Sequence, residues 1–560
     1  MNKTKICVFL FGLMIFCQTQ FVFANGSSEK NEKNTTNQSQ PVKVPKYTEE
    51  QRQFLETGAI EKLIADKPVE AMWQAKLAYE ANPSTEEYSS LYTKTKNAVI
   101  AAFNQACTDS KWVEAMGYFE SLESCGVKNA VQAGWSYEQL LQKALPAAEY
   151  TAKTQQTAPK MSTMVKGTVT VWVDLGLKIE GGTGYANRVL GSGFFIDSRG
   201  YLVTNHHVIE NMVDPKYEGY ARLYITLADD PDERIPAKVV AYDKDLDLAL
   251  LRTPVPPPHV FPLGTSEDLE IGDKIYAIGS PIGLERTITS GIVSNPERKL
   301  LSTATVMQID AAINSGNSGG PVLAENGSVQ AVVFAGILQY EGLNFGIPVE
   351  YLKTILPRLY AGGKIEHSWI GAYGRNYRDD AFLPYGVELF YVMPGSPAAK
   401  SGLKAGDIIK SIGGKKFTTI EQLQNVLLYK QPSSIITIEY ERDGVQKTAA
   451  VYTMVRPENP GYEIYQRDSV ANYFLPIFGM QLFLTKDSIH KKEYVVTKVL
   501  PNTVADEAGF SENDKIEFSR IRVNDDKDAI LTEVYAKKRK NGYVDIFISL
   551  ANSLDSPYYF

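Results

Sequence analysis

The chain has 560 residues, which is enough for three to five domains, and 44% of them are hydrophobic, so ordinary cores can form. Lysine and arginine together number 58 and aspartate and glutamate 65, which gives a net charge of −7. The basic residues form no long run. This argues against nucleic acid as the main partner, because phosphate binding draws on clustered Lys and Arg.

Residues 1–24 have the features of a secretory signal peptide. Lys3 and Lys5 give a positive start, the run from Ile6 to Phe16 is almost wholly apolar, and the segment ends on a small residue at Ala24. The apolar run is too short to span a bilayer comfortably. We expect a protein exported to the periplasm or the cell exterior and soluble after signal removal; a retained anchor is the alternative.

Residues 25–46 are rich in Asn, Ser, Thr, Lys and Gln, which predicts a disordered spacer. In residues 47–158, Ala, Leu, Trp and Tyr recur at helical spacing between short breaks, which predicts an α-helical domain loosely similar to tetratricopeptide repeats. Cys107 and Cys125 lie in this region. Export would permit a disulfide between them, and two free thiols are the equal alternative.

The pattern changes again in residues 160–363, where short β-branched and aromatic runs such as "GTVTVWVDL", "YLVTNHHVI" and "DKIYAIGS" are separated by Gly, Asp and Pro. This predicts an all-β region of the barrel or sandwich type, followed by a short helix after the last strand. Residues 364–455 and 470–554 each mix strands with helical patches in a similar order. That similarity suggests a duplicated small module.

A serine, a histidine and an aspartate occur in an order suited to nucleophilic catalysis. Ser318 lies in the glycine-rich stretch "NSGNSGGPV", and His207 lies in "TNHHVI", which we interpret as a strand with His206 on its opposite face. Asp247 sits between two leucines, so burial and an imidazole partner are expected; Asp243 and Asp245 are the solvent-facing rivals. The order His, Asp, Ser is that of chymotrypsin.

The chemistry explains each residue type. A serine hydroxyl attacks well only when a base takes its proton, histidine titrates in the right range, and an aspartate fixes its tautomer. The backbone N–H groups of Gly316 and Ser318, with Asn317 as a further candidate, are the predicted oxyanion donors. No cofactor is needed. No metal site is expected at the histidine pair, because no Cys or further His clusters nearby.

Four stretches, "GSGFFIDSRGYLVTNHHVI", "DKDLDLALL", "YAIGSPIGLERTITSGIVS" and "DAAINSGNSGGPVL", together resemble the HtrA (Deg-type) family of trypsin-like serine proteases. The resemblance covers about residues 167–363 and implies a chymotrypsin-like double β-barrel. The family pattern Thr-Asn-x-His-Val selects His207 as the base. The family has no counterpart of the helical region that precedes this domain.

The resemblance also implies loops that gate activity. Residues 280–290, 295–304 and 335–346 correspond to the activation, sensor and pocket loops. The pocket loop is shorter than expected for the family, and no aspartate stands where a trypsin-like pocket would need one. Small or medium apolar residues before the cleaved bond are the expected preference.

The two tail modules resemble PDZ domains, which bind an extended peptide as an added strand. In the first, Trp369, Ile370, Gly371 and Ala372 match the peptide-binding loop. In the second, the run from Ile477 to Met480 has the same shape, but "GFSENDKI" lacks the usual Gly-Asp pair. Tyr558-Tyr559-Phe560 is either an ordinary strand end or a tethered ligand for a PDZ groove.

Taken together, these features predict an exported serine endopeptidase of multidomain architecture: an N-terminal α-helical domain, an all-β protease domain and two α+β modules. The expected partners are unfolded or damaged polypeptides as substrates and C-terminal peptides at the PDZ modules. The resemblance implies a homo-oligomer, a trimer or a multiple of it. The alternative function is a peptide-binding chaperone or sensor with little proteolysis.

Overall fold

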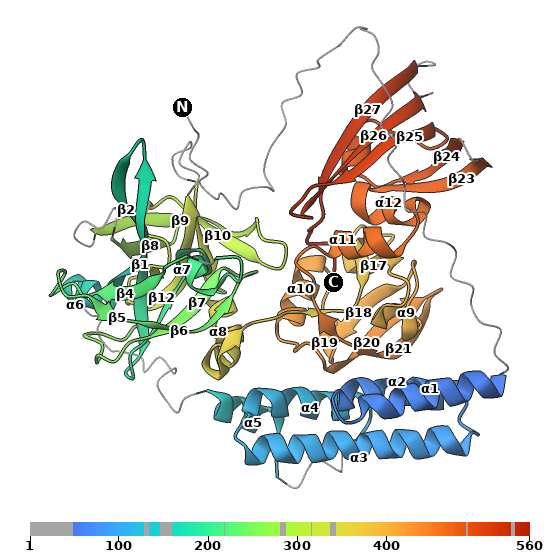
Figure 1. Ribbon diagram of the computed structural model, residues 1–560, viewed down its shortest axis with the longest axis horizontal. Helices are drawn as coiled ribbons and strands as arrows, with labels where there is room; N and C mark the ends of the chain where they lie inside the picture. The colour runs from blue at the N-terminus through green and yellow to red at the C-terminus, as the bar shows by residue number, and fades with distance from the viewer. Residues whose placement is uncertain are drawn as a thin grey trace.

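The computed structural model describes residues 49–127, 134–145, 160–217, 219–280, 287–314, 316–336, 343–488, 491–538 and 544–560. The predicted signal peptide and spacer lie outside these ranges. Within them, no helix combines the length and apolarity needed to cross a membrane. Figure 1 shows residues 160–363, the predicted protease region, on one side, two further β-rich modules on the other, and a layer of helices beneath both.

The N-terminal region is helical, as predicted, and its helices pack side by side. Its described helices are α1 (Glu49–Leu63), α2 (Pro68–Ala81), α3 (Glu86–Thr108), α4 (Trp112–Ser124) and α5 (Tyr137–Ala144). Ser136 begins α5 with a reciprocal capping box to Gln139. The core contains Trp73, Phe103 and Phe119, so these aromatic residues serve packing. Cys107 and Cys125 are free thiols in this structure.

The protease region is built from one eight-stranded sheet and one closed barrel in the described residues. The sheet runs in the order β14 (Gly363–Lys364), β6 (Lys238–Asp243), β7 (Leu248–Arg252), β3 (Tyr201–Thr204), β2 (Thr183–Asp197), β1 (Thr168–Glu180), β4 (Arg222–Thr226) and β5 (Ile235–Pro236). The barrel runs β10 (Thr305–Ile309), β13 (Asn344–Pro348), β12 (Val329–Gly336), β11 (Pro321–Leu323), β8 (Lys274–Gly279) and β9 (Thr287–Lys299).

Three helices accompany these strands: α6 (Met161–Gly167), α7 (His206–Val213) and α8 (Val349–Ala361). The last is the helix predicted after the final strand. Its buried face, with Leu352, Ile355 and Leu359, joins a core that also holds Phe194 and Val203 of the sheet and strands of the barrel. The helix therefore closes the region by packing both halves together.

The first C-terminal module, residues 364–455, has an edge strand, a hairpin and a helix that faces them. Its elements are β15 (Ser368–Trp369), β16 (Ala372–Arg378), β17 (Pro384–Val392), α9 (Pro397–Lys400), β18 (Ile408–Ile412), β19 (Lys415–Lys416), α10 (Ile420–Leu428), β20 (Ile435–Arg442), β21 (Val445–Tyr452) and β22 (Met454–Val455). The sheet order β16-β17-β18-β20-β21 leaves β16 at the edge.

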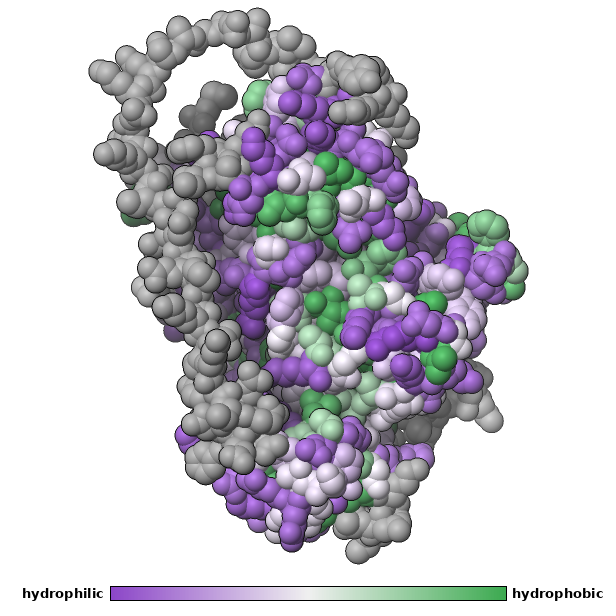
Figure 2. Space-filling model, turned by 90° about the vertical axis from the view of Figure 1, so that its right-hand side faces the viewer, coloured by the Kyte–Doolittle hydropathy of each residue, from purple (hydrophilic) through white to green (hydrophobic). Residues whose placement is uncertain are grey.

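The second module begins with two helices that pack on the first. Its elements are α11 (Pro460–Arg467), α12 (Val470–Phe478), β23 (Met480–Ser488), β24 (Lys491–Val499), α13 (Val504–Glu507), β25 (Lys515–Val523), β26 (Ala529–Lys538) and β27 (Val544–Ser553). Its sheet runs in plain chain order from β23 to β27. Figure 2 shows one face of the molecule, where the hydrophobic side chains of the described surface form separate groups among hydrophilic ones.

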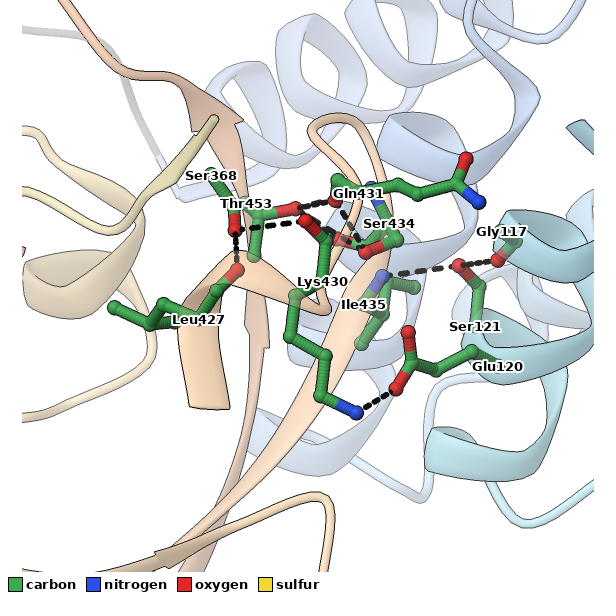
Figure 3. Close-up of polar contacts among 10 residues, drawn as sticks. All are labelled: Gly117, Glu120, Ser121, Ser368, Leu427, Lys430, Gln431, Ser434, Ile435 and Thr453. Carbon is green, nitrogen blue, oxygen red and sulfur yellow. Dashed lines mark hydrogen bonds and ion pairs between the residues drawn. The ribbon is translucent and has the colours of Figure 1, made fainter. Parts of the chain in front are cut away.

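The helical domain is joined to the first module by buried polar contacts (Figure 3). The Ser121 hydroxyl on α4 accepts a hydrogen bond from the Ile435 N–H at 2.9 Å and donates to the Gly117 carbonyl at 2.7 Å. Lys430 forms an ion pair with Glu120, and both side chains are largely buried. Since β20 begins at Ile435, a helix side chain satisfies a backbone donor of that strand.

Candidate active site

His207 and Asp247 are in direct contact. The Nδ1 atom of His207 lies 2.7 Å from Oδ2 of Asp247, and the backbone N–H of His207 donates to Oδ1 at 2.8 Å. Asp247 is buried, with 7% of its surface exposed. Its carboxylate is therefore held by two bonds to one residue, which fixes the orientation of the imidazole ring.

The environment of His207 sets its protonation. Burial lowers the pKa of the ring, but the charge and the hydrogen bond of Asp247 outweigh burial and raise that pKa above its usual value. The ring is then a stronger base than a free histidine. A proton taken from a neighbouring hydroxyl would be stabilised on it by the carboxylate.

The predicted strand at the two histidines is wrong. Strand β3 ends at Thr204, Asn205 is extended, and His206 begins the short helix α7. The Asn205 side chain donates to the Asp247 carbonyl at 2.9 Å, which secures the turn into the helix. His206 is buried and stacks on Tyr242 with ring centroids 5.1 Å apart. As predicted, the two rings lie in different environments. Their different directions result from the geometry of a helix and not from the alternation of a strand.

Asp247 sits in a tight turn between β6 and β7. Its φ of 52° is in the left-handed region, which Asp tolerates better than most residues. Asp243 and Asp245 were both predicted to face solvent; Asp243 does not, and the Asp245 side chain is only partly exposed. Asp243 is fully buried and lies 2.9 Å from Nε2 of His367, while Asp245 lies 3.9 Å from a guanidinium nitrogen of Arg456. The chain brings these partners from either end of the first module, which sequence spacing alone could not reveal.

Ser318 lies in a glycine-rich loop that joins the barrel strands β10 and β11 and contacts the sheet. Its carbonyl accepts from the Ser192 N–H at 2.8 Å, and the Ser192 hydroxyl donates to the Gly316 carbonyl at 2.6 Å and accepts from the Ser280 N–H at 3.0 Å. A Cβ at Gly319, where φ is 85°, would lie 2.3 Å from the Ser192 carbonyl oxygen. Glycine is thus required for the loop to approach the sheet so closely.

The same close approach brings the loop to the histidine-bearing segment, because that Cβ would also lie 2.4 Å from Oγ1 of Thr204 and 3.0 Å from the Asn205 nitrogen. The Ser318 hydroxyl itself donates to the Phe334 carbonyl at 3.5 Å. In the described part of the chain it makes no hydrogen bond with His207. The predicted nucleophile and the predicted base therefore belong to adjoining segments but are not joined in this conformation.

The predicted oxyanion donors divide into two groups. The Asn317 N–H donates to the Asn314 carbonyl at 3.0 Å, so the turn itself uses this group. The N–H groups of Gly316 and Ser318 have no acceptor among the described residues, and Gly316 has a φ of 102° that suits a tight turn. The described residues also contain no group of three or more His, Cys, Asp and Glu placed to hold a metal ion.

The predicted peptide-binding loop borders the edge strand of the first module. Trp369 and Ile370 are buried, and Gly371 has a φ of 83° with its carbonyl accepting from the Met393 N–H at 2.9 Å. Ala372 begins β16, and its N–H donates to the Phe560 carbonyl at 2.8 Å. The loop therefore leads into a strand whose free edge is in contact with the end of the described chain.

Parts of the predicted gating loops lie outside the described residues, namely 281–286 of the activation loop and 337–342 of the pocket loop. The predicted sensor loop is described, and its first half continues β9 as far as Lys299, which forms an ion pair with Glu421 of α10. The side chain of a predicted gating loop thus contacts the helix of the first module.

Family models match four parts of the chain. A trypsin-like peptidase domain matches residues 191–332, a PDZ domain matches 369–453, and the TP0546 family PDZ domain matches 461–554. A domain of unknown function matches residues 55–144, which is the helical region. The predicted boundary of the second module at residue 470 is therefore later than this match, which begins in α11.

Curated relatives align with about half of the chain. A probable periplasmic serine endoprotease DegP-like from Chlamydia trachomatis is 32% identical over 51% of this chain and 58% of its own length. Protease Do-like 1, chloroplastic, from Arabidopsis thaliana is 33% identical over 48% of this chain and 64% of its own length. The chain thus spans about three fifths of these relatives.

Solved structures of the HtrA type overlap similarly. The structure titled HtrA-type protease AlgW with decapeptide has 23% identity and a TM-score of 0.44, and covers 53% of this chain and 97% of its own. The assignment rests on the domain matches and the curated relatives. The match to a trypsin-like peptidase domain, followed by two matches to PDZ domains and joined with the DegP-like relatives, supports an HtrA-family serine protease.

Proposed function

We propose that the chain is an exported serine endopeptidase that cleaves unfolded or damaged proteins and is regulated by peptide binding at its first PDZ module. The observation that carries this proposal is the 2.7 Å contact between His207 Nδ1 and Asp247, supported by the neighbouring Ser318 loop. Names of relatives such as "periplasmic serine endoprotease" support both the activity and the compartment.

In the proposed reaction, Ser318 Oγ attacks the carbonyl carbon of the scissile bond while Nε2 of His207 takes its proton. Asp247 holds the ring and stabilises the imidazolium. The oxyanion accepts hydrogen bonds from the N–H groups of Gly316 and Ser318, each worth roughly 3 to 4 kcal/mol of transition-state stabilisation. His207 then protonates the leaving amine, and water activated by the same ring hydrolyses the acyl-enzyme.

The orientation of Ser318 favours a resting state before substrate binds. For attack, its hydroxyl must leave the Phe334 carbonyl, 3.5 Å away, and turn towards the imidazole. We propose that loops around the site make this change when peptide or substrate binds, and the contact between Lys299 and Glu421 offers a link from α10 to the sensor loop. A trimeric assembly remains part of the proposal from the family resemblance.

The test is cleavage of reduced casein by the full chain beside Ser318→Ala, with hydrophobic C-terminal peptides added as activators. We expect cleavage by the parent and none by the variant. Asp247→Asn should lower kcat by about 10⁴-fold, because the ring loses its fixed tautomer. If the folded parent never cuts, with or without peptide, the chaperone or sensor function becomes the better account.

The pH dependence gives a second measurement. The base must be neutral to act, and the pKa of His207 is raised, so activity should rise with pH through a value above the usual pKa of about 6.5. A profile of kcat/KM against pH locates this limb. A limb below the usual value would contradict the proposed pairing of His207 with an ionised Asp247.

A further inference from the structure

The last residues of the chain lie against the edge strand of the first module. We name Asp555–Phe560 the tail; it follows β27 and lies beyond the family match that ends at residue 554. It passes between the two modules and ends beside β16, the edge strand of the first. Figure 1 places the C-terminus close to α10 and β17, away from the strands of the second module.

Main-chain hydrogen bonds join the tail to β16 as an added antiparallel strand. The Ala372 N–H donates to the Phe560 carbonyl at 2.8 Å, and the Phe560 N–H donates back to the Ala372 carbonyl at 3.0 Å. Two residues along, the Gly374 N–H donates to the Tyr558 carbonyl at 3.1 Å. This alternation is the pattern by which an extended peptide extends a sheet edge.

Helix α10 holds the other side of the tail. The side-chain amide of Gln424 donates to the Pro557 carbonyl at 2.9 Å and to the Tyr559 carbonyl at 3.1 Å. Gln424 is itself buried. The tail backbone therefore has partners on the strand and on the helix, which are the two walls between which a PDZ domain takes its peptide.

The Phe560 side chain fills the interior of the first module. It is 1% exposed and belongs to the same hydrophobic core as Ile370, Leu423 and Leu427. A Cβ on Gly374 would lie 3.0 Å from the phenyl ring, so the strand has a glycine where the ring passes. The ring is buried as completely as the core residues around it, so its removal from water stabilises the bound position of the tail.

Tyr559 faces the other way. It is 1% exposed, lies in the core of the second module, and its hydroxyl donates to the Pro476 carbonyl at 2.9 Å. Successive residues of an added strand point to opposite sides, so the tail joins both modules at once. This gives a matched pair of positions: Phe560 for the groove and Tyr559 for the neighbouring module.

We propose that the tail is an intramolecular ligand of the first module, and that another peptide binds this groove only by displacing it. The competing ligand is an extended peptide with a phenyl-sized apolar side chain at the Phe560 position. The proposal rests on the proposed peptide-binding role of the first module and is independent of whether the protease cuts. A tether raises the effective concentration to the millimolar range, so a tail with micromolar affinity would weaken a competitor by roughly 1,000-fold.

The experiment measures binding of a peptide to the full chain. The probe is a fluorescent peptide with the sequence of residues 553–560, SLDSPYYF, and every protein carries Ser318→Ala so that the probe is not cleaved. We expect Phe560→Asp, which cannot keep its side chain in the apolar core, to lower the Kd of the probe at least tenfold. Equal Kd values for the parent and this variant would overturn the proposal.

The matched control is Tyr559→Phe, which loses only the hydrogen bond to Pro476. We expect the Kd of the probe to stay within twofold of the parent. If this variant tightens binding as much as Phe560→Asp, loosening of the modules explains the effect and displacement does not. In the parent, saturating probe should speed amide hydrogen exchange at residues 558–560, and unchanged exchange would contradict displacement.

Two further outcomes separate this proposal from the proposed function. If Phe560→Asp abolishes the thermal transition of the first module, the tail is a structural core element and the proposal is overturned. If both proteins stay folded and neither binds the probe, peptide regulation fails as well. Casein cleavage by the chain with Ser318 intact is read separately and bears only on the protease.

Discussion

The two C-terminal modules begin alike and then differ. Gly371 and Gly479 both have left-handed φ values, 83° and 85°, and their carbonyls accept hydrogen bonds from the N–H groups of Met393 and Leu500, which directly follow β17 and β24. The first module then inserts α10 before β20 and β21, the last two strands of its main sheet. In the second, a turn at 524–528 connects β25 directly to β26.

The comparison indicates that a peptide groove requires two walls, an edge strand and a facing helix. In the first module the tail lies between an edge strand and α10, with Gln424 of the helix binding its backbone. The second module offers the edge strand β23 but, in its described residues, no helix between β25 and β26 to form the second wall. We therefore expect peptide binding at the first module, while the second supplies the tail.

The largest expected effect concerns the attachment of the first module to the protease. Asp243→Asn would break a fully buried pair with His367, which should lower the free energy of unfolding by about 3 to 5 kcal/mol. Asp245→Asn, at a longer and partly exposed contact, should cost less than about 1 kcal/mol. Urea unfolding of the full chain measures both, and equal losses would contradict a buried latch.

The same pair gives a pH dependence. Burial raises the pKa of Asp243, but the charge and hydrogen bond of His367, with the Leu246 N–H, outweigh burial and lower it. A lowered pKa contributes stability above the unfolded value of about 3.9, and this stability is lost as pH falls through the folded value. The acid loss of stability should therefore be smaller in Asp243→Asn than in the parent.

The next effect tests the shared glycines. Alanine at Gly371 would place Cβ 2.4 Å from Ser396, and at Gly479 it would lie 2.2 Å from Thr503. With the left-handed φ, each substitution should cost about 2 to 3 kcal/mol. In the Phe560→Asp, Ser318→Ala background, only the Gly371 variant should also weaken probe binding. Loss of binding in the Gly479 variant, with the first module folded, would break the comparison.

A smaller effect concerns the second wall of the groove. In the Phe560→Asp, Ser318→Ala protein, Gln424→Ala should weaken the probe about fivefold, since one hydrogen-bonding group contributes about 1 kcal/mol. With Phe560 intact, the change in the Kd of the probe should be much smaller, because the tail and the probe both lose their hydrogen bonds to Gln424. Equal weakening in both proteins would mean that the two ligands bind differently.

The smallest effect concerns one residue of the second module. Asn513 has a φ of 71° and donates to the Val496 carbonyl, as Gly406 at φ 93° donates to Leu389. Asn513→Gly should raise the free energy of unfolding by up to about 1 kcal/mol, because glycine adopts this conformation without strain. Thermal unfolding measures the shift, and a clear loss of stability would show that the asparagine side chain has another role.

The sequence predicted what depends on local pattern. The glycines around Ser318 and the apolar neighbours of Asp247 are contiguous features, so the loop and the buried carboxylate could be read directly. The missing Gly-Asp pair in "GFSENDKI" leaves the turn in place, since Asn513-Asp514 occupies it with a left-handed asparagine. Residue identity alone does not reveal such a conformational substitute.

Features that depend on distant contacts were not predictable. The periodicity at "TNHHVI" fits a strand, and the helix at His206 depends on the turn that Asn205 makes with Asp247. Asp243 lies between Tyr242 and Lys244, so it is not flanked by two apolar residues as Asp247 is. The partner that it contacts in the interior, His367, is 124 residues away in the sequence. The absence of a helix between β25 and β26 of the second module became clear only from the structure.

Ser192 has a mechanical consequence for the protease. Its N–H and hydroxyl join the Ser318 carbonyl, the Gly316 carbonyl and the Ser280 N–H, so one residue of the sheet pins the nucleophile loop and the end of a barrel strand. The barrel holds the same loop from the other side, because the Gly319 N–H donates to the Val333 carbonyl of β12 at 2.9 Å. A rotation of the barrel against the sheet would therefore break one of these two sets of hydrogen bonds, so the loop that carries Ser318 ties the two halves together.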